Sequence, residues 1–235
     1  MTLAKRIVPT MLVRGRTLVK GKQFAGDRSI GHVLQAARVH AARGVDELCI
    51  LDIGATAEGR GPDLDMVREL TAGCWIPVTV GGGVKSLQDI DALLRAGADR
   101  VCIGAAADGP LIREASDHFG RQAIVVSIDV HADEVTNAKG KAIAMDCYGA
   151  GEILLQSVDR DGLMCGYDIE LIRAVASAVD IPVIASGGCK DYEDMEAAFK
   201  AGADACAVGA LFAFSDETPR GAARWLKSRG VEVRV

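Results

Sequence analysis

The sequence predicts a (β/α)8 TIM barrel, an α/β fold in which eight parallel strands alternate with helices. Two observations predict it. Short apolar runs alternate along the chain with segments whose apolar residues recur at helical spacing. In addition, a long stretch of the first half recurs in the second half without a gap. The 235 residues fit one such barrel and no linker divides them, so we expect a single domain over 1–235.

The candidate strands are continuous apolar runs, which are typical of parallel strands covered by helices. The first four are 6–13, 47–53, 77–82 and 100–106, and helical periodicity follows them over 29–44, 63–73, 86–97 and 111–120. The last four are 123–130, 152–159, 182–188 and 205–212, each followed by helix-compatible sequence. An open doubly wound sheet is the alternative architecture.

The internal repeat keeps one constant spacing over three βα units. It pairs Gly82 with Gly187 and Gly104 with Gly209. A repeat of this length predicts two half-barrels, roughly 1–120 and 121–235, rather than a solenoid of short repeats.

Composition argues against several classes of function. The net charge is -5 and the basic residues are spread along the chain, so nucleic acid is not expected as the main partner. The N-terminal apolar run is too short for a secretion signal and no window approaches a membrane span, so we expect a cytoplasmic protein without a membrane partner.

The cysteines and histidines do not form metal motifs. There are seven cysteines with no Cys-x-x-Cys pair, and Cys49, Cys102 and Cys206 lie in apolar strands, which predicts reduced core thiols. The four histidines lack metal-ligand spacing, and three of them fall in predicted helices. We therefore expect neither a metal nor a cofactor.

Small-residue loops follow four strands, at the end of a TIM barrel where active sites lie. Exposed backbone N–H groups before a helix attract phosphate, and repetition of the loops favours two phosphate sites over simple tight turns. A substrate with a phosphate at each end would suit such a pair. The predicted phosphate-binding residues are Gly82, Gly83, Gly104, Ala105, Ser186, Gly187, Gly188, Gly209 and Ala210.

Carboxylates at strand ends are the candidates for proton transfer, because an apolar barrel raises their pKa. Asp129 is the first choice, and Asp52 and Asp161 are equally well explained as loop anchors. Asp159 and His131 lie close by in sequence, His131 without an expected function. Lys20 is predicted to act at the site by binding phosphate or as a mobile cation, unless it is a solvated loop lysine.

Four charged residues stand at the starts of strands, at the opposite end of the barrel. Two cations alternating with two anions there can close the bottom opening as a ring of ion pairs, although isolated strand-end charges are usually just solvated. The four are Arg6, Glu47, Arg100 and Glu152.

The segments “KRIVP”, “GVDELCILDI”, “VTVGGG”, “VVSIDV”, “GAGEILLQSVDRDG” and “IPVIASGG” together resemble the cyclase subunit of imidazole glycerol phosphate synthase over nearly the whole chain. The resemblance implies a TIM barrel that pairs with a glutaminase subunit at its N-terminal face. It implies that ammonia passes a charged gate at the four residues above and reaches a bisphosphorylated substrate at the top. It also implies that Lys20 is the flexible loop lysine of the family and that the glycine loops are its two phosphate sites.

The sequence departs from this family at its catalytic pair. The family has one aspartate near the end of strand one and another at the end of strand five; Asp129 matches the second, but Leu12 stands at the first. Loss of one member of an acid/base pair costs about two to four orders of magnitude in rate. Arg100 also replaces the usual lysine, Gly104 and Ala105 replace polar side chains, and the segment 131–141 is shorter than the family's hairpin.

Leu12 and the stretch 58–86 resemble a paralogous branch that serves acetamidino modification of surface sugars such as O-antigen, together with a glutaminase and a sugar amidotransferase. We therefore expect an ammonia-channelling barrel subunit of a glutamine amidotransferase system, working as a lyase-type synthase. One alternative is a genuine cyclase of histidine biosynthesis that uses Asp129 with Asp52 or Asp161. The others are a non-catalytic activator of the glutaminase and the related isomerase of the same pathway.

Overall fold

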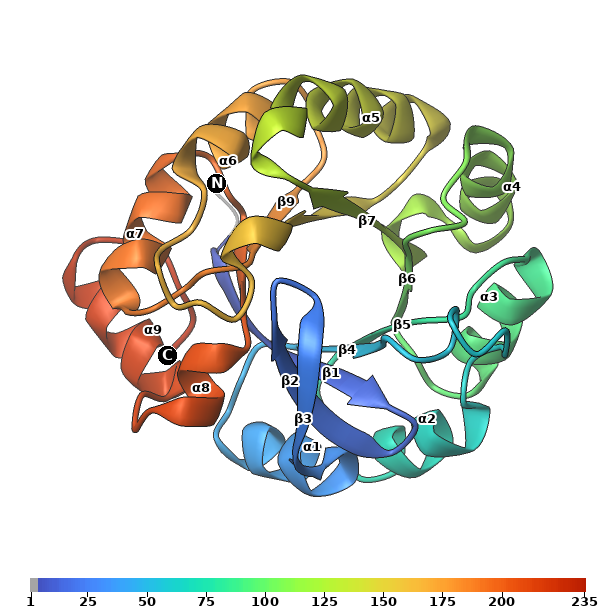
Figure 1. Cartoon of the computed structure of the whole chain (residues 1–235), viewed down its shortest axis with the longest axis horizontal. Helices are drawn as coiled ribbons and strands as arrows, with labels where there is room; N and C mark the ends of the chain where they lie inside the picture. Colours follow the sequence, from blue (N-terminus) through green and yellow to red (C-terminus); the bar gives the residue numbers. More distant parts are fainter. Residues whose placement is uncertain (1–3) are drawn as a thin grey trace.

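The computed structural model describes residues 4–235 and shows eight parallel strands that close into a barrel inside a ring of helices (Figure 1). The strands follow one another in chain order, and the last pairs with the first, as Cys206 with Ile7. The predicted TIM barrel is confirmed. Its strands are β1 (Arg6–Arg14), β4 (Leu48–Asp52), β5 (Val78–Gly81), β6 (Arg100–Ile103), β7 (Ile124–Val130), β8 (Glu152–Ser157), β9 (Val183–Ser186) and β10 (Ala205–Val208).

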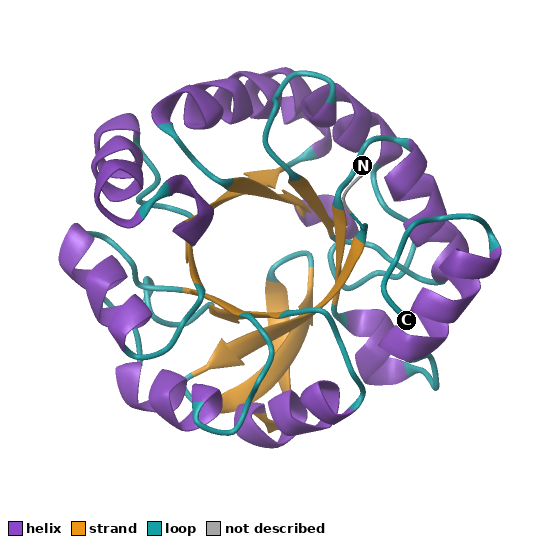
Figure 2. Ribbon diagram, turned by 180° about the vertical axis from the view of Figure 1, so that it is seen from behind, coloured by secondary structure: helices purple, strands orange, loops and turns teal. Residues whose placement is uncertain are grey.

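The helices lie outside the strands, as Figure 2 shows from behind. Most begin at a Ser, Thr or Asp whose side chain accepts a hydrogen bond from the first turn, as Ser86 and Asp191 do at repeat-related positions. The helices are α1 (Val33–Ala42), α2 (Leu64–Thr71), α3 (Leu87–Arg95), α4 (Gly109–Phe119), α5 (Val135–Tyr148), α6 (Ile169–Ala176), α7 (Tyr192–Lys200), α8 (Ala210–Phe214) and α9 (Pro219–Ser228). Short 3-10 turns are η1 (Arg121–Ala123), η2 (Ala132–Glu134) and η3 (Val158–Arg160).

A β-hairpin after β1 differs from the sequence prediction, which placed a basic loop there and began the first helix at residue 29. Strands β2 (Thr17–Lys22) and β3 (Ala25–His32) pair antiparallel, and His32 caps α1 instead of lying inside it. Most of β3 is exposed on both faces, so its sequence lacks the alternation that predicts a strand. Figure 1 shows the hairpin crossing the barrel mouth toward η3.

Other segments also differ from the expected boundaries; β6, for example, ends at Ile103 rather than at residue 106. The segment 131–141, predicted as a shortened loop, forms η2 and the first half of α5. The last strand ends at Val208 rather than at residue 212, because α8 begins at Ala210. Residues 1–3, part of the stretch considered above for a leader, lie outside the described residues.

The inside of the barrel is a separate apolar cluster built from alternate strand residues. Cys49 and Cys102 belong to it, whereas Cys206 packs against the helices, and all three are buried free thiols as predicted. Burial raises the pKa of Cys102 to about 12, so that thiol is neutral at physiological pH. The cluster comprises Val8, Cys49, Leu51, Cys102, Val125, Leu154, Ile184, Ala205 and Ala207, with Leu12 packed against it.

Equivalent hydrogen bonds link neighbouring strands in the two halves of the chain. Asp99 accepts the backbone N–H of Val78 at 2.8 Å, and the repeat-related Asp204 accepts that of Val183 at 3.1 Å. Each aspartate thereby ties the start of one strand to the start of the next. These equivalent contacts occur at positions related by the repeat, and the division into half-barrels stays a prediction.

Candidate functional site

Two neighbouring cavities open at the C-terminal ends of the strands. The larger, here the mouth cavity, has a volume of about 530 Å³. The smaller, here the Lys20 cavity, has a volume of about 30 Å³. Leu12, Gln156 and Asp161 line both, so these three side chains form the boundary between the cavities.

The predicted phosphate loops divide between the cavities according to the repeat. Their backbone is held in the left-handed region at the glycines: φ is 71° at Gly83 and 99° at Gly188. A Cβ at Gly83 would lie 2.7 Å from the carbonyl oxygen of Arg60, so only glycine fits this close approach. Gly82, Gly83, Gly104 and Ala105 line the mouth cavity, and Ser186, Gly187, Gly188, Gly209 and Ala210 line the Lys20 cavity.

Lys20 is a buried residue of the hairpin. Its Nζ donates to the carbonyl oxygen of Thr10 at 3.4 Å and lies so close over Gly209 that any side chain there would collide with it. Burial lowers the pKa of Lys20, and the nearby carboxylate of Asp161 opposes this effect. The structure thus places a cation directly over one small-residue loop, which a solvated loop lysine would not do.

Asp129 lies at the end of β7 in the mouth cavity, within a chain of hydrogen bonds. Its Oδ1 accepts from Ser127 Oγ and from Gln156 Nε2, both at 3.2 Å. Gln156 Oε1 in turn accepts from Ser186 Oγ at 3.2 Å. This chain of hydrogen bonds connects the carboxylate of Asp129 to the glycine loop that begins at Ser186, on the other side of the boundary, and fixes the orientation of the carboxylate.

Asp161 is the second carboxylate at the boundary. Burial raises its pKa, and Lys20 partly offsets the rise. A raised pKa makes a carboxyl group a stronger base in its ionised form, which favours a role in proton transfer. Its backbone carbonyl accepts the N–H of Gln23 at 2.9 Å, so the tip of the hairpin rests on the residue.

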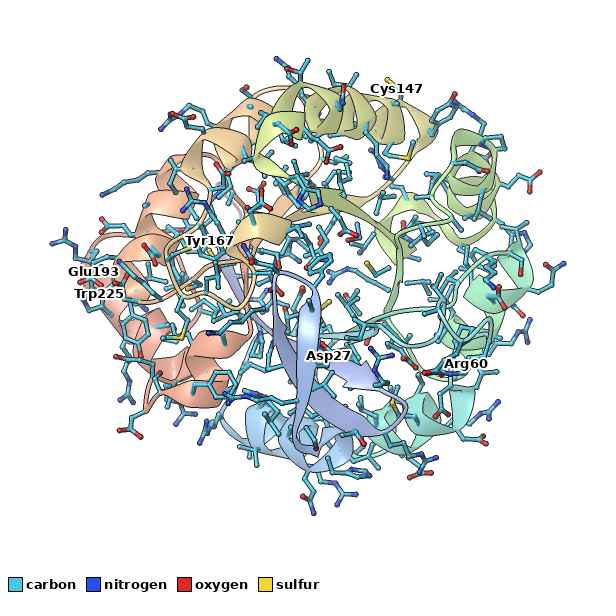
Figure 3. The ribbon with its side chains drawn as sticks, viewed as in Figure 1. Asp27, Arg60, Cys147, Tyr167, Glu193 and Trp225 are labelled. Atoms are coloured by element: carbon cyan, nitrogen blue, oxygen red, sulfur yellow. The ribbon has the colours of Figure 1, made fainter. Side chains whose placement is uncertain are left out.

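Asp52 is engaged differently. It is buried at the end of β4, where Oδ1 accepts the N–H of Gly54 at 3.0 Å and Oδ2 lies 2.8 Å from Nη1 of Arg60. Figure 3 labels Asp27 on the hairpin and Arg60 farther out, toward the ring of helices. These partners favour the loop-anchoring role for Asp52, although its side chain also lines the mouth cavity.

His131 and Asp159 form an ion pair with a distance of 3.0 Å outside both cavities. The hydrogen bond to His131 lowers the pKa of Asp159, and the same bond raises that of His131. Neither is among the residues that line the cavities. The pair stabilises the turn that follows β7, since Asp159 also accepts the N–H of Ala132 at 2.8 Å.

Leu12 is half-buried at the end of β1, opposite Leu51 of β4. Its side chain packs against the apolar interior and reaches both cavities. The boundary therefore has an apolar group where the resembling family has a carboxylate, with Asp129 and Asp161 as the nearby acids.

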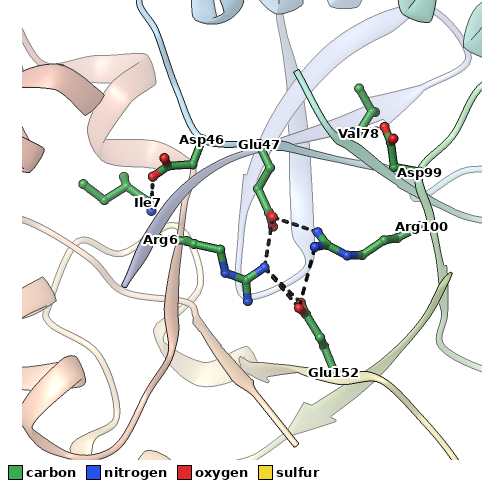
Figure 4. Close-up of polar contacts among 8 residues, drawn as sticks. All are labelled: Arg6, Ile7, Asp46, Glu47, Val78, Asp99, Arg100 and Glu152. Atoms are coloured by element: carbon green, nitrogen blue, oxygen red, sulfur yellow. Dashed lines mark hydrogen bonds and ion pairs between the residues drawn. The ribbon is translucent and has the colours of Figure 1, made fainter. Parts of the chain in front are cut away.

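The four strand-start charges, here the charged ring, form a closed set of ion pairs at the bottom of the barrel (Figure 4). Glu47 Oε2 lies 2.9 Å from Nη1 of Arg6 and 2.7 Å from Nη1 of Arg100. Glu152 Oε1 completes the ring at 3.1 Å from Arg6 and 3.9 Å from Arg100. The other oxygen of Glu47, Oε1, is buried without a hydrogen-bond partner among the described residues.

Sequence reasoning missed Ser127, Gln156 and Thr10. Each is a polar residue within a strand, and no motif marks it. The available indication was chemical: Gln156 interrupts the apolar run of β8, in which the preceding residues are buried. A polar residue at an inward position of a barrel strand needs a partner, and here the partner is Asp129.

Among residues 4–235, no cluster of three or more histidine, cysteine or acidic side chains is arranged to hold a metal ion. The helices of the described part are all too short or too polar to cross a lipid bilayer.

Comparison with known proteins identifies the family. The model of the family described as “Histidine biosynthesis protein” matches residues 6–218. The chain is 40% identical over 250 aligned positions to imidazole glycerol phosphate synthase subunit HisF of Dictyoglomus thermophilum, covering 99% of each chain. The alignment is longer than this chain, so the relative carries insertions that are absent here. The expected sugar-modification branch finds no support in these matches. This chain belongs to the histidine biosynthesis protein family.

Proposed function

We propose that the protein is the synthase subunit of a glutaminase-coupled enzyme, which adds ammonia to a phosphorylated small molecule at the barrel mouth. The observation that carries the proposal is the charged ring at one end of the barrel with two glycine-lined cavities at the other. A glutaminase at the N-terminal face would release ammonia on the outer side of the ring. The HisF relative is itself named a subunit of a synthase.

The barrel interior offers ammonia an uncharged route between the two ends. Its apolar cluster includes the neutral thiol of Cys102, and Ala205 and Ala207 contribute only methyl groups. The buried Thr79 of β5, opposite Cys49, adds an uncharged hydroxyl. Neutral ammonia crosses such a lining at little cost, whereas ammonium would lose its hydration. The unpartnered Oε1 of Glu47 would accept an N–H of ammonia as it passes the ring.

For the chemistry, the relative favours cyclisation to imidazole glycerol phosphate. In this reaction Asp129 would act as general base or acid in the mouth cavity, oriented by Ser127 and Gln156. Asp161 would supply the second proton-transfer group, since it lies at the same boundary as Leu12 and burial raises its pKa. The two glycine-lined sites would hold the phosphates, with Lys20 neutralising the one next to Gly209.

Leu12 favours a second candidate, the barrel subunit of an acetamidino-forming system for surface sugars. In that system the ammonia route would be retained while ring closure is lost, and a sugar amidotransferase would be the further partner. The family matches do not point to this branch, so its support is the missing carboxylate together with the resemblance of the stretch 58–86.

One assay separates the candidates. The purified chain is supplied with the bisphosphorylated substrate of the imidazole pathway and ammonium salt, and the Leu12→Asp variant is measured alongside. Turnover by the native chain that is lost in Asp161→Asn supports cyclisation with Asp161 as the second acid. No turnover by the native chain, but turnover by Leu12→Asp, supports the acetamidino candidate. If neither chain turns over or binds the substrate, the synthase proposal is wrong, and activation of the glutaminase alone becomes the remaining role.

A further inference from the structure

Trp75 is the most exposed large hydrophobic residue of the described chain, with 95% of its surface accessible. It lies in the connection between α2 and β5, at the N-terminal face of the barrel. Beside it is a groove of about 600 Å³, lined by apolar residues such as Ile76 and Pro77 and bordered by Arg68 and Asp99. A fully exposed indole next to an apolar groove is typical of an interface rather than of a monomer surface.

The second half of the barrel provides an internal comparison. The repeat places Asp180 where Trp75 stands, within otherwise matching segments that lead to Val78 and Val183. Both segments use the same backbone anchor, the carboxylates of Asp99 and Asp204. The backbone therefore accepts a small polar residue at this position, and it does not require the tryptophan. The two halves of the N-terminal face thus differ in chemistry at an equivalent point.

The charged ring fixes where a partner must sit. Trp75 precedes Val78 by three residues, so their Cα atoms are at most about 11 Å apart. The backbone N–H of Val78 donates a hydrogen bond to the carboxylate of Asp99, and Asp99 directly precedes Arg100 of the ring (Figure 4). A stable interface covers about 800 Å² on each partner, a patch about 30 Å across. A subunit that seals the opening of the ring with a patch of this size reaches the part of the N-terminal face that carries Trp75.

We infer that Trp75 anchors the glutaminase subunit, inserting into an apolar pocket of that subunit while the groove beside it receives a side chain in return. The inference rests on the proposed function, which requires a glutaminase over the ring. The inference adds that the two halves of the barrel contact the glutaminase differently. The apolar centre of the interface lies on the N-terminal half, around Trp75, and its polar margin lies near Asp180 of the C-terminal half.

The test is binding of the glutaminase from the organism that carries this chain. We expect Trp75→Ala and Trp75→Asp to weaken the affinity by about 30-fold, the lower bound for a hot-spot residue. Asp180→Ala, at the repeat-related position, should change it less than threefold. Because Trp75 is exposed, neither Trp75 variant should shift the thermal unfolding of the free chain, which is checked in parallel.

A second readout locates the contact directly. The chain has two tryptophans, so labelling it with 5-fluorotryptophan gives two ¹⁹F resonances, which Trp225→Phe assigns. Addition of glutaminase should shift the resonance of Trp75 and leave that of Trp225 in place. Binding with unchanged Trp75 and an unaffected Trp75→Ala variant would overturn the inference and leave the proposed function intact. Absence of any complex would overturn both, and self-association through Trp75 would assign the surface to a second copy of this chain.

Discussion

At the scale of single residues, the proposed chemistry takes place at the boundary between the two cavities. The position of Asp129 at the barrel mouth was predictable from the sequence because it follows an apolar strand, and the positions of the glycine loops were predictable because they repeat. Gln156 was not, since its role depends on the distance to Asp129 across two strands. Nor could the sequence distinguish Asp52 from Asp161. Arg60 forms an ion pair with Asp52, whereas burial beside Lys20 raises the pKa of Asp161. Neither contact can be read from the sequence.

The first prediction concerns Asp129. Replacement by Asn keeps an oxygen that can accept from Ser127 and Gln156, so the fold and substrate affinity should be retained. Loss of the acid/base group should lower ammonium-dependent turnover by about 10² to 10⁴. Steady-state kinetics would check this, with the exposed Asp159→Asn as the control. Equal loss in both variants would place the proton transfer elsewhere.

Lys20 leads to a prediction on stability and pH. Burial lowers its pKa in the folded state, whereas the unfolded chain keeps the ordinary value of 10.5. Between these two values the unfolded state binds more protons, so the free energy of unfolding rises with pH. At lower pH the folded state must hold a charged ammonium group in a buried place, which lowers the free energy of unfolding. Lys20→Met removes this burial of charge. We therefore expect the variant to have a higher thermal midpoint at about pH 7, with a gain that vanishes above pH 10.5.

The control for this prediction is Lys22→Met, because Lys22 lies in the same strand but is exposed. Inorganic phosphate provides the functional counterpart. It should raise the thermal midpoint of the native chain and of Lys22→Met, and do so less for Lys20→Met. A Lys20→Met variant that is destabilised near neutral pH and still stabilised by phosphate would contradict the assignment.

At the scale of elements, the hairpin is the part of the fold that the sequence did not predict. Its two turn residues, Gln23 and Phe24, have φ values of 52° and 59°, a conformation for which Asn-Gly is preferred. The usual sequence marker of a two-residue turn is therefore missing. The barrel strands were predicted because burial on both faces leaves continuous apolar runs, a pattern that β3 lacks.

The strained turn can be measured with a matched pair of variants. Phe24→Gly and Phe24→Ala both remove the ring, and they differ only in how well the backbone accepts a positive φ. We expect the glycine variant to be more stable by about 1 kcal/mol. Chemical unfolding of the two proteins would check the difference, and an alanine variant of equal stability would mean that the turn relaxes to another conformation.

At the scale of the whole molecule, the charged ring closes one end of the barrel. Glu47 is buried and pairs with Arg6 and Arg100, so Glu47→Gln leaves two guanidinium groups with Glu152 alone. We expect a loss of about 1 to 3 kcal/mol in the free energy of unfolding, less than for a fully buried pair because the arginines are partly exposed. Urea unfolding measures the loss, and Asp91→Asn, which breaks an exposed pair with Arg95, is the control.

The position of Lys20 has a consequence for the kinetics of ligand exchange. A space of about 30 Å³ holds roughly one water molecule, so a phosphate can enter only after the ammonium group has moved away from Gly209. Lys20 extends from the hairpin, whose tip rests with Gln23 on Asp161, so its side chain must swing aside before ligand enters. The observed association rate should therefore reach a plateau at high ligand concentration, and the height of that plateau is the rate at which the ammonium group leaves Gly209.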